Sequence, residues 1–439
     1  MIGGAIRIIV YVLIVTLPVW LATWLGKGAE GMVTDVARNF GLMGFTILMM
    51  QPVIAGRFHW IERAFGMDIL IRFHKYIAVA AAALLLLHPI LLSIGHGSWR
   101  LLIGLKLPWY IWVGKGVLIL VVVQVLVSLY QGKIGLTFEK WRLGHDLAAP
   151  VILVLIFFHS WFAGDDLDLV VLKSLWVVVI LVAVAAFLYH RLVRPACLRR
   201  HPYRVQEVVK ETENVWTVKL IPPPDRRIEN YLPGQFHFLT FFRNRSLPVE
   251  EHHWTISSSP TQKDFISSTI KESGDFTATI GETRAGDRAA VHGPFGRFSY
   301  ALHPEERNLV FLVGGIGITP IMAMLRHMND LGDTRSVTLL YANHNQDQIV
   351  FREELDRMAK EGCPRLTVVH VLSRAEKDWD GETGHVDGKM IEKYCGPSLK
   401  DKVFYICGPP GMAKALLKAL GERGVSKQQI RREIFSFVD

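Results

Sequence analysis

Cysteine is scarce in this sequence. The 439 residues include four cysteines, Cys197, Cys363, Cys395 and Cys407, and no two of them have the short spacing of a paired metal-binding motif. We therefore expect neither a disulfide framework nor a zinc or iron–sulfur site built from cysteine pairs.

A basic stripe of the kind that binds nucleic acids is also missing. The formal net charge is +9, but lysine and arginine are not interleaved with aromatic residues along any one segment. The sequence has no internal repeat of solenoid length. We expect no nucleic-acid partner and attribute the excess of cations to membrane topology.

Charged residues are rare before residue 195 and common after Arg199. The first part contains six apolar stretches, each long enough for a helix that crosses a hydrocarbon core of about 30 Å. The stretches lie near residues 6–25, 40–56, 69–94, 109–130, 145–163 and 169–192. Because the first has no convincing small-residue cleavage site, we expect it to remain in the protein as a span.

The positions of lysine and arginine predict the orientation of these spans. Cations gather between spans two and three, between spans four and five, and after span six, whereas one opposite loop carries Asp165, Asp166 and Asp168. The cations are Arg57, Arg63, Arg72, Lys133, Lys140, Arg142, Arg191, Arg194, Arg199 and Arg200. By the positive-inside rule, both termini are cytoplasmic.

Four histidines lie in two of the apolar stretches. His74 and His88 are fourteen residues apart in the third stretch, and His145 and His159 are fourteen residues apart in the fifth. Fourteen helical residues return to within roughly 40° of the same face and span about 21 Å. Because the two stretches cross the membrane in the same direction, His74 can face His145 while His88 faces His159.

Two stacked histidine pairs predict two bis-histidine haem sites. Imidazole is a good axial ligand of haem iron, and two axial imidazoles leave no open position, which suits electron transfer. A single histidine in a membrane more often bonds a neighbouring helix, and this is the alternative for each residue taken alone. Four histidines in two equal pairs favour a shared role as iron ligands.

After residue 198 the patterns are those of a soluble protein. Short alternating runs separated by proline, glycine or polar turns predict a small antiparallel β-barrel over residues 199–302. Strands that alternate with helices predict an α/β nucleotide-binding domain over residues 303–439. The expected fold is a six-span membrane α-helical bundle, residues 1–198, fused to these two domains.

Two turns are expected at one edge of the α/β domain. The first contains Gly314, Gly315, Gly317, Thr319 and Pro320, and the second is Cys407-Gly408-Pro409-Pro410. Glycine permits close approach to a pyrophosphate, Thr319 can cap the following helix, and Pro320 fits its first turn. Both turns follow buried strands, and ligands of open α/β sheets bind at the carboxyl ends of strands.

Three segments resemble flavin-binding motifs of one enzyme superfamily. They are HHWTISSSP at residues 252–260, KESGDFT at 271–277 and GPFG at 293–296. The first is similar to the His-Pro-Phe-Thr form found in NADPH oxidases and ferric reductases, whose reductase module is of the ferredoxin–NADP reductase type. With the six spans and four histidines, the resemblance to bacterial members of the NADPH oxidase and ferric reductase superfamily covers nearly the whole chain.

The resemblance implies roles for individual residues. Trp254 stands where an aromatic ring packs on the flavin, Thr255 where a hydroxyl approaches the isoalloxazine, and His252 where a donor meets the FAD phosphates. The implied flavin site also includes Ile256, Ser257, Lys271, Ser273, Gly274 and Thr277, of which the last three help to hold the pyrophosphate. Cys407 joins Thr255 in the implied catalytic site, together with a terminal aromatic residue that covers the flavin, Phe435 or alternatively Phe437.

The choice between NADPH and NADH depends on two segments. Ser373 and Arg374 resemble the pair that grips the 2′-phosphate in NADP-dependent relatives. The segment YANH at residues 341–344 lacks the basic residue that a 2′-phosphate would call for. Together these observations favour NADPH narrowly.

The resemblance implies a flavocytochrome b in a bacterial inner membrane, surrounded by lipid. Electrons would pass from cytosolic NADPH or NADH through FAD and two b-type haems to an acceptor at the outer face. We favour oxygen as the acceptor, which gives superoxide; the alternatives are a ferric chelate and a periplasmic protein partner. A further alternative, in which the helices only anchor a soluble flavin reductase, predicts no haem.

Overall fold

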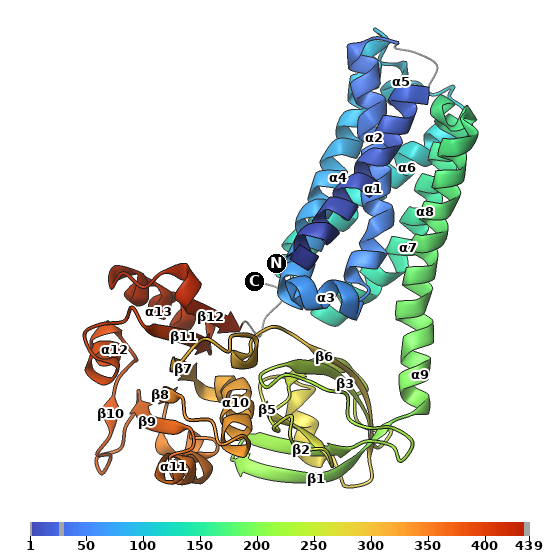
Figure 1. Cartoon of the computed structure of the whole chain (residues 1–439). Coiled ribbons are helices and arrows are strands. Elements are labelled where there is room, and N and C mark those ends of the chain that lie inside the picture. The colour runs from blue at the N-terminus through green and yellow to red at the C-terminus, as the bar shows by residue number, and fades with distance from the viewer. Residues whose placement is uncertain (1, 26–29, 434–439) are drawn as a thin grey trace. The chain divides into compact units, whose positions relative to one another are not determined.

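The computed structural model describes residues 2–25 and 30–433. By internal contacts the chain divides into two compact units, Met1–Arg194 and Pro195–Asp439. Figure 1 shows that the first unit is helical and that the second contains the sheets. Each unit has a hydrophobic core of its own.

The first unit is a bundle of long helices joined by short ones. The long helices are α1 (Ile2–Leu25), α2 (Met32–Ala55), α4 (Met67–Gly95), α6 (Trp109–Tyr130), α7 (Phe138–Ala163) and α8 (Val170–Leu188). The short helices are α3 (His59–Phe65), α5 (Arg100–Ile103) and η1 (Asp165–Asp168). A π-helical turn, η2 (Tyr189–Val193), joins α8 to α9 (Arg194–Arg200), which begins at the last residue of the first unit and continues into the second.

Among the described residues, five helices are long and apolar enough to cross a membrane. A sixth candidate is the pair formed by α2 and α3, which is bent by 90° at its break. The multi-pass prediction is thus supported, with five or six spans. The second span begins at Met32 rather than near residue 40, because the charged Arg38 is accommodated in the helix by ion pairs with Asp166 and Glu30.

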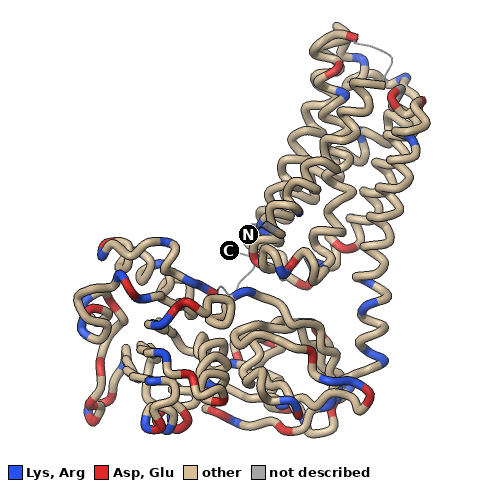
Figure 2. The backbone as a smooth tube through the Cα atoms, viewed as in Figure 1, with Lys and Arg blue, Asp and Glu red and all other residues tan. Residues whose placement is uncertain are grey.

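The helical bundle has a packed interior and an apolar exterior. Inside, the rings of Phe45 and Trp176 stack with centroids 4.5 Å apart, and the indole of Trp176 donates a hydrogen bond to Ser160. Outside, Ile119 and Leu181 are 64% and 62% exposed. Figure 2 shows that charged residues gather toward the ends of the helices. An apolar belt of this kind is suited to lipid rather than water.

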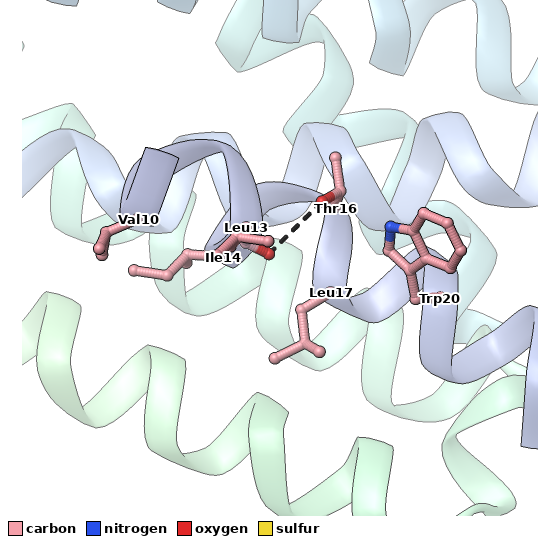
Figure 3. Close-up of a pocket in the computed structure, with 6 residues that line it drawn as sticks. All are labelled: Val10, Leu13, Ile14, Thr16, Leu17 and Trp20. Atoms are coloured by element: carbon pink, nitrogen blue, oxygen red, sulfur yellow. Dashed lines mark hydrogen bonds between the residues drawn. The ribbon is translucent and has the colours of Figure 1, made fainter. Parts of the chain in front are cut away.

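The exposed side of α1 contains an open apolar hollow of about 420 Å³ (Figure 3). Its lining residues are Val10, Leu13, Ile14, Thr16, Leu17 and Trp20. Thr16 donates its hydroxyl to the carbonyl of Val12 at 2.9 Å, so its polar group is satisfied within the helix. The hollow therefore presents hydrocarbon to its surroundings.

The second unit begins with a six-stranded antiparallel sheet of order β4-β3-β6-β1-β2-β5. The strands are β1 (Tyr203–Thr212), β2 (Val215–Ile221), β3 (Phe236–Phe242), β4 (Glu251–Thr255), β5 (Ile266–Lys271) and β6 (Arg288–Phe295). The predicted antiparallel pattern is confirmed, but the ladder ends at β4 and β5 instead of closing. A backbone hydrogen bond from Ser257 to Ser267 links the segment after β4 to β5.

The rest of the unit is a parallel sheet of order β10-β9-β8-β7-β11-β12, as predicted for an α/β domain. The strands are β7 (Asn308–Gly314), β8 (Ser336–Asn343), β9 (Arg365–Leu372), β10 (Glu382–Thr383), β11 (Lys402–Cys407) and β12 (Ile430–Glu433). The helices are α10 (Ile318–Asp330), α11 (Arg352–Glu361), α12 (Gly388–Cys395) and α13 (Pro410–Glu422). Strand order reverses between β7 and β11, so their carboxyl ends form the topological switch point where such sheets bind ligands.

Candidate functional site

The two predicted turns lie side by side at the switch point. β7 and β11 pair in parallel with Val313 opposite Cys407, so each turn begins at the same edge of the sheet. A Cβ atom placed on Gly317 would lie 2.3 Å from the carbonyl oxygen of Cys407, and one on Gly314 would lie 2.9 Å from the ring Cδ atom of Pro409. Glycine is therefore required at both positions by the contact between the turns.

Thr319 does not cap α10, contrary to the sequence prediction. Gly317 occupies the N-cap position without a side-chain cap, because the helix already begins at Ile318. The hydroxyl of Thr319 instead donates to the carbonyl of Ile316 at 3.1 Å, and the side chain is buried. Pro320 lies in the first turn of the helix, as predicted. Gly315, with φ of +53°, supplies the left-handed residue of the turn.

Cys407 is completely buried at the end of β11. Burial raises the pKa of its thiol well above the ordinary range, so the thiol stays protonated at neutral pH. Its carbonyl oxygen, rather than its sulfur, is the atom that contacts the first turn. Gly408 packs against the same turn, with a Cβ there 3.0 Å from the backbone nitrogen of Gly314. Pro409 precedes the first turn of α13 as its N-cap residue.

Ser373 and Arg374 lie beyond the end of β9, beside the end of β8. The backbone nitrogen of Ser373 donates to Asn343, and that of Arg374 donates to His344 at 2.7 Å. The Nδ1 atom of His344 is 3.0 Å from the hydroxyl of Ser373, and both His344 and Arg374 are exposed. The sequence analysis considered residues 341–344 separately from Ser373 and Arg374, and the parallel pairing of β8 with β9 places His344 beside this pair.

β4 carries the residues predicted to meet a flavin. His252 and Trp254 share one face of the strand, because side chains alternate along it. Both pack on Phe276, with ring centroids 4.4 Å and 5.9 Å away. The Nε2 atom of His252 is hydrogen-bonded to Glu250 at 2.8 Å. A donor role toward phosphate would therefore fall to the other ring nitrogen, Nδ1.

The residues at and after the end of β4 are buried. Thr255 and Ile256 are 7% and 3% exposed, and Ser257 is completely buried. The hydroxyl of Ser257 is hydrogen-bonded to Ser267 and Thr269, each at 3.0 Å. This hydroxyl is used inside the protein, so Ser257 is suited to holding the strand end in place.

The predicted pyrophosphate turn is compact and solvent-exposed. The backbone nitrogens of Ser273 and Gly274 donate to the Oγ1 atom of Thr277 at 2.8 Å and 2.9 Å. Thr277 begins the one-turn helix η3 (Thr277–Glu282), and Lys271 is the last residue of β5 just before the turn. The Oγ1 atom of Thr277 therefore occupies the place to which the two amides point, as the acceptor at the centre of the turn.

Arg243, just beyond the end of β3, contacts residues of this turn and of η3. The sequence analysis missed it. Its guanidinium lies 5.0 Å from the ring centroid of Phe276 and donates to the carbonyl of Thr279 at 2.7 Å. An arginine just after a strand has no distinguishing sequence pattern. Its role is visible only once β3 is seen to end beside η3.

Arg326 connects the antiparallel sheet to the α/β domain. From α10 it donates to the carbonyl of Ser257 at 2.6 Å and makes a two-pronged ion pair with Glu354 of α11. Bidentate pairs of this kind fix orientation as well as adding energy. The helix that begins at the glycine turn is thereby tied to the strand end that follows the flavin motif.

The first histidine pair is close together as predicted. The ring centroids of His74 on α4 and His145 on α7 are 6.1 Å apart. The Nδ1 atom of His74 is buried and has no hydrogen-bond partner among the residues that the structure describes. A buried polar atom without a partner is costly, which favours a ligand at this position.

The second pair lies about 21 Å farther along the same two helices, by helical rise. The Nδ1 atom of His88 is 2.8 Å from the carbonyl of Ala37, and that of His159 is 2.9 Å from the carbonyl of Tyr110. Each ring donates Nδ1–H to a carbonyl and keeps Nε2 as an acceptor, which is the usual arrangement of a metal-bound histidine. These donor sets fit two bis-histidine haem sites.

Phe435, predicted to cover the flavin, and its alternative Phe437 lie outside the described residues. The last described strand, β12, places Glu433 opposite Cys407. The chain therefore reaches the switch-point edge of the sheet at Glu433.

Two family models match this chain. Residues 40–156 match a ferric reductase like transmembrane component, and residues 311–418 match an oxidoreductase NAD-binding domain. The first range includes His74, His88 and His145 and ends before His159. The second range includes both turns at the switch point and the Ser373–Arg374 pair.

Several reductases are similar to parts of the chain. NADH-cytochrome b5 reductase 1 of Lodderomyces elongisporus is 35% identical over 157 residues, which are 36% of this chain and 52% of that protein. NADH-cytochrome b5 reductase 1 of Mycosarcoma maydis is 27% identical over 242 residues, 54% of this chain and 74% of that protein. Thus the chain spans about half the length of the first of these relatives.

One solved structure that matches part of the chain is the cytochrome b5 reductase domain of Ulva prolifera nitrate reductase. The identity is 20%, the match covers 53% of this chain and 96% of that one, and the TM-score is 0.47. The matched families and the relatives above are oxidoreductases. This chain combines a ferric reductase-like transmembrane component with an oxidoreductase NAD-binding domain.

Proposed function

We propose that this chain, in which a ferric reductase-like transmembrane component precedes an oxidoreductase NAD-binding domain, is a membrane flavocytochrome. It would take hydride from NAD(P)H and carry electrons through FAD and two haems across the bilayer. The observation that carries the proposal is the pairing of four histidines at two levels of α4 and α7. Helices that served only as an anchor would have no need of these pairs.

Residues at the switch point would bind the nicotinamide nucleotide. Gly315 leaves the backbone accessible at the start of α10, because an added Cβ atom there would have nothing within 4 Å, while Gly317 and Gly408 let the two turns pack against each other. Helix N-termini carry unpaired amides and a partial positive charge, which suit a pyrophosphate. The nucleotide would then bind at the edge of the sheet where Cys407 ends β11, and the protonated thiol of Cys407 adds no charge there.

FAD would bind against β4 and η3. Both elements belong to the proposed FAD-binding domain, residues 199–302. When bound, FAD supplies the conversion of a two-electron hydride into single electrons. The chain would pack Trp254 against the flavin ring and set the hydroxyl of Thr255 near it. Ser273, Gly274 and Thr277 would line the phosphates, with Arg243 fixing the turn.

Haem would occupy both histidine pairs and supply one-electron transfer when bound. Nε2 of His88 and of His159 would hold one iron, while their Nδ1 protons stay on backbone carbonyls. His74 and His145 would hold the other; Asp146, next to His145, forms an ion pair with Arg191 of η2, so this pair lies at the end of the bundle where α8 ends. We therefore name His74/His145 the inner pair and His88/His159 the outer pair.

A reduced-minus-oxidised visible spectrum of the purified protein tests the proposal directly. We expect b-type haem bands, a pyridine-haemochrome count of two haems per chain and reduction of both by NAD(P)H. A protein that binds FAD and oxidises NAD(P)H but contains no haem would instead be an anchored flavin reductase.

The terminal acceptor at the outer face is proposed to be oxygen, with superoxide as the product. A ferric chelate is the second candidate, because the transmembrane region matches the ferric reductase model. Reoxidation of the reduced haems should be followed under air, and under argon with ferric citrate. Rapid reoxidation under air with no response to ferric citrate would assign oxygen, and the reverse would assign the chelate. No response to either would point to a periplasmic protein partner.

NADPH is the proposed donor, and Arg374 is expected to select it. Arg374→Ala should raise the KM for NADPH about tenfold while changing that for NADH less than twofold, because a charge-assisted hydrogen bond contributes about 1.5 to 3 kcal/mol. Steady-state dye reduction with each nucleotide measures the ratio. Arg357→Ala, at an exposed arginine of α11, is the control. An unchanged NADPH/NADH ratio in Arg374→Ala would remove this residue from the nucleotide site.

The proposed location is a bacterial inner membrane with both termini in the cytoplasm. The support is the gathering of lysine and arginine at one set of loops and of acidic residues at Asp165–Asp168. Cysteine-labelling of Glu30→Cys and Glu139→Cys in intact cells tests the orientation. An impermeant maleimide should label position 30 and not position 139; the opposite pattern would invert the topology.

A further inference from the structure

The two outer histidines are held in the same way by different neighbouring helices. His88 lies against Gly41 of α2, where an added Cβ atom would be 2.9 Å from its Nδ1 atom. His159 lies against Gly114 of α6, where an added Cβ atom would be 2.4 Å from its Cε1 atom and 2.5 Å from its Nδ1 atom. Real Cβ atoms do not approach other atoms this closely, so each ring occupies space that only glycine leaves.

The same two helices also provide the hydrogen bonds of these rings. The carbonyl that receives Nδ1–H belongs to Ala37 for His88 and to Tyr110 for His159. In both helices this carbonyl lies four residues before the glycine, one turn away on the same helix face. The glycine and the carbonyl one turn before it therefore form one arrangement that occurs in both helices. This arrangement fixes the plane and the tautomer of the imidazole ring.

The inner pair is built differently. Nδ1 of His74 has no hydrogen-bond partner among the described residues. Nδ1 of His145 lies 3.8 Å from a carboxylate oxygen of Asp146, beyond hydrogen-bond distance, and its ring packs near Trp141. The glycine-and-carbonyl arrangement is thus a property of the outer pair.

We propose that Gly41 and Gly114 are positioning residues for the outer haem. Each admits an imidazole ring against its helix so that Nδ1 reaches the carbonyl one turn earlier and Nε2 is presented to iron. This inference rests on the proposed function and deepens it by naming residues of the haem site that carry no ligand atom. A hydrogen bond from Nδ1–H raises the basicity of a histidine ligand, so the same arrangement would tune an iron held there.

General helix packing is the competing explanation, because glycine often allows membrane helices to approach closely. The two explanations differ in which atoms the glycine contacts. A Cβ atom on Gly44, also on α2, would lie 2.7 Å from the side chain of Leu85, so Gly44 serves the packing of α2 on α4 without touching a histidine. A Cβ atom on Gly116, two residues beyond Gly114 on α6, would have nothing within 4 Å.

The experiment compares the ferric EPR spectrum, the haem count and the midpoint potentials of full-length variants in detergent. His88→Ala first identifies the signal of the outer haem. Gly114→Ala should shift or remove that signal and leave the inner one unchanged. Gly41→Ala should do the same more weakly, since its contact is longer, and it provides the test if Gly114→Ala is not inserted stably.

Gly116→Ala and Gly44→Ala are the matched controls on the same two helices. Both should keep the two EPR signals of the unaltered protein. The inference is overturned if Gly114→Ala and Gly41→Ala retain the original outer signal, or if Gly44→Ala alters it as much as Gly41→Ala does. Absence of haem from the unaltered protein would instead overturn the proposed function, so the two failures are distinguishable.

Discussion

His88→Ala and His159→Ala should each remove one haem and leave the other reducible by NAD(P)H. Each replacement would remove one of the two histidines proposed to hold the outer haem, while the inner histidine pair lies about 21 Å away by helical rise and is unaltered. Haem content should fall from about two to about one per chain, and reduction of an acceptor at the outer face should cease. Pyridine-haemochrome analysis and acceptor assays measure the two effects.

His74→Ala and His145→Ala should give the opposite defect. In the proposed route the inner haem receives electrons first, so its loss should leave the outer haem unreduced by NAD(P)H although dithionite still reduces it. A soluble dye that takes electrons from flavin should still be reduced in all four variants, because the nucleotide turns belong to the second unit. His96→Ala, at the exposed end of α4, is the control on the same helix. If all four variants retain two bis-histidine haems, the four histidines are not the haem ligands and only make ordinary contacts between helices.

The histidine pairs could be predicted because they depend on helical geometry alone. A separation of fourteen residues returns a side chain to nearly the same face of any helix. The same reasoning cannot say which helix stands behind each ring. Gly41 and Gly114 were therefore missed, since their role follows from the contacts of α2 with α4 and of α6 with α7.

The positions of the switch-point turns could also be predicted from the sequence, because they depend only on local patterns and on the order of parallel strands. Buried strands that end in glycine predict an edge, and parallel order places the edges together. Sequence reasoning failed for Thr319, where the helix begins at Ile318 and the hydroxyl is turned inward. It also missed Arg243 and the proximity of His344 to Ser373, because their neighbours are distant in the chain and are set by strand pairing.

The same distinction applies to the flavin motif. A motif fixes which residues alternate along β4, and His252 and Trp254 do share a face as a strand requires. It does not show that Nε2 of His252 is bonded to Glu250 or that Ser257 is bonded inside the protein. These partners narrow which atoms of the motif are available to a ligand.

Gly317→Ala should have the largest effect on the reaction with nicotinamide nucleotides. The added Cβ atom would lie 2.3 Å from the carbonyl oxygen of Cys407 and 3.0 Å from the backbone nitrogen of Gly408. These are backbone atoms at the centre of a sheet, so the two turns must separate by about an ångström to restore ordinary contact. Overpacking of this kind costs about 1 to 3 kcal/mol.

The displacement falls on the amides that would bind the pyrophosphate, so we expect Gly317→Ala to raise the KM for NAD(P)H at least about tenfold, equivalent to about 1.4 kcal/mol. FAD and haem contents should stay unchanged, and dithionite should still reduce the haems, because the flavin motif and the histidine pairs lie on other elements. Gly421→Ala, in α13 with nothing within 4 Å of the added atom, is the control for a glycine replaced in the same domain. Stopped-flow reduction of the flavin by NAD(P)H separates the variants. If Gly317→Ala is reduced as rapidly as the control at low nucleotide concentration, the nucleotide does not bind across these two turns.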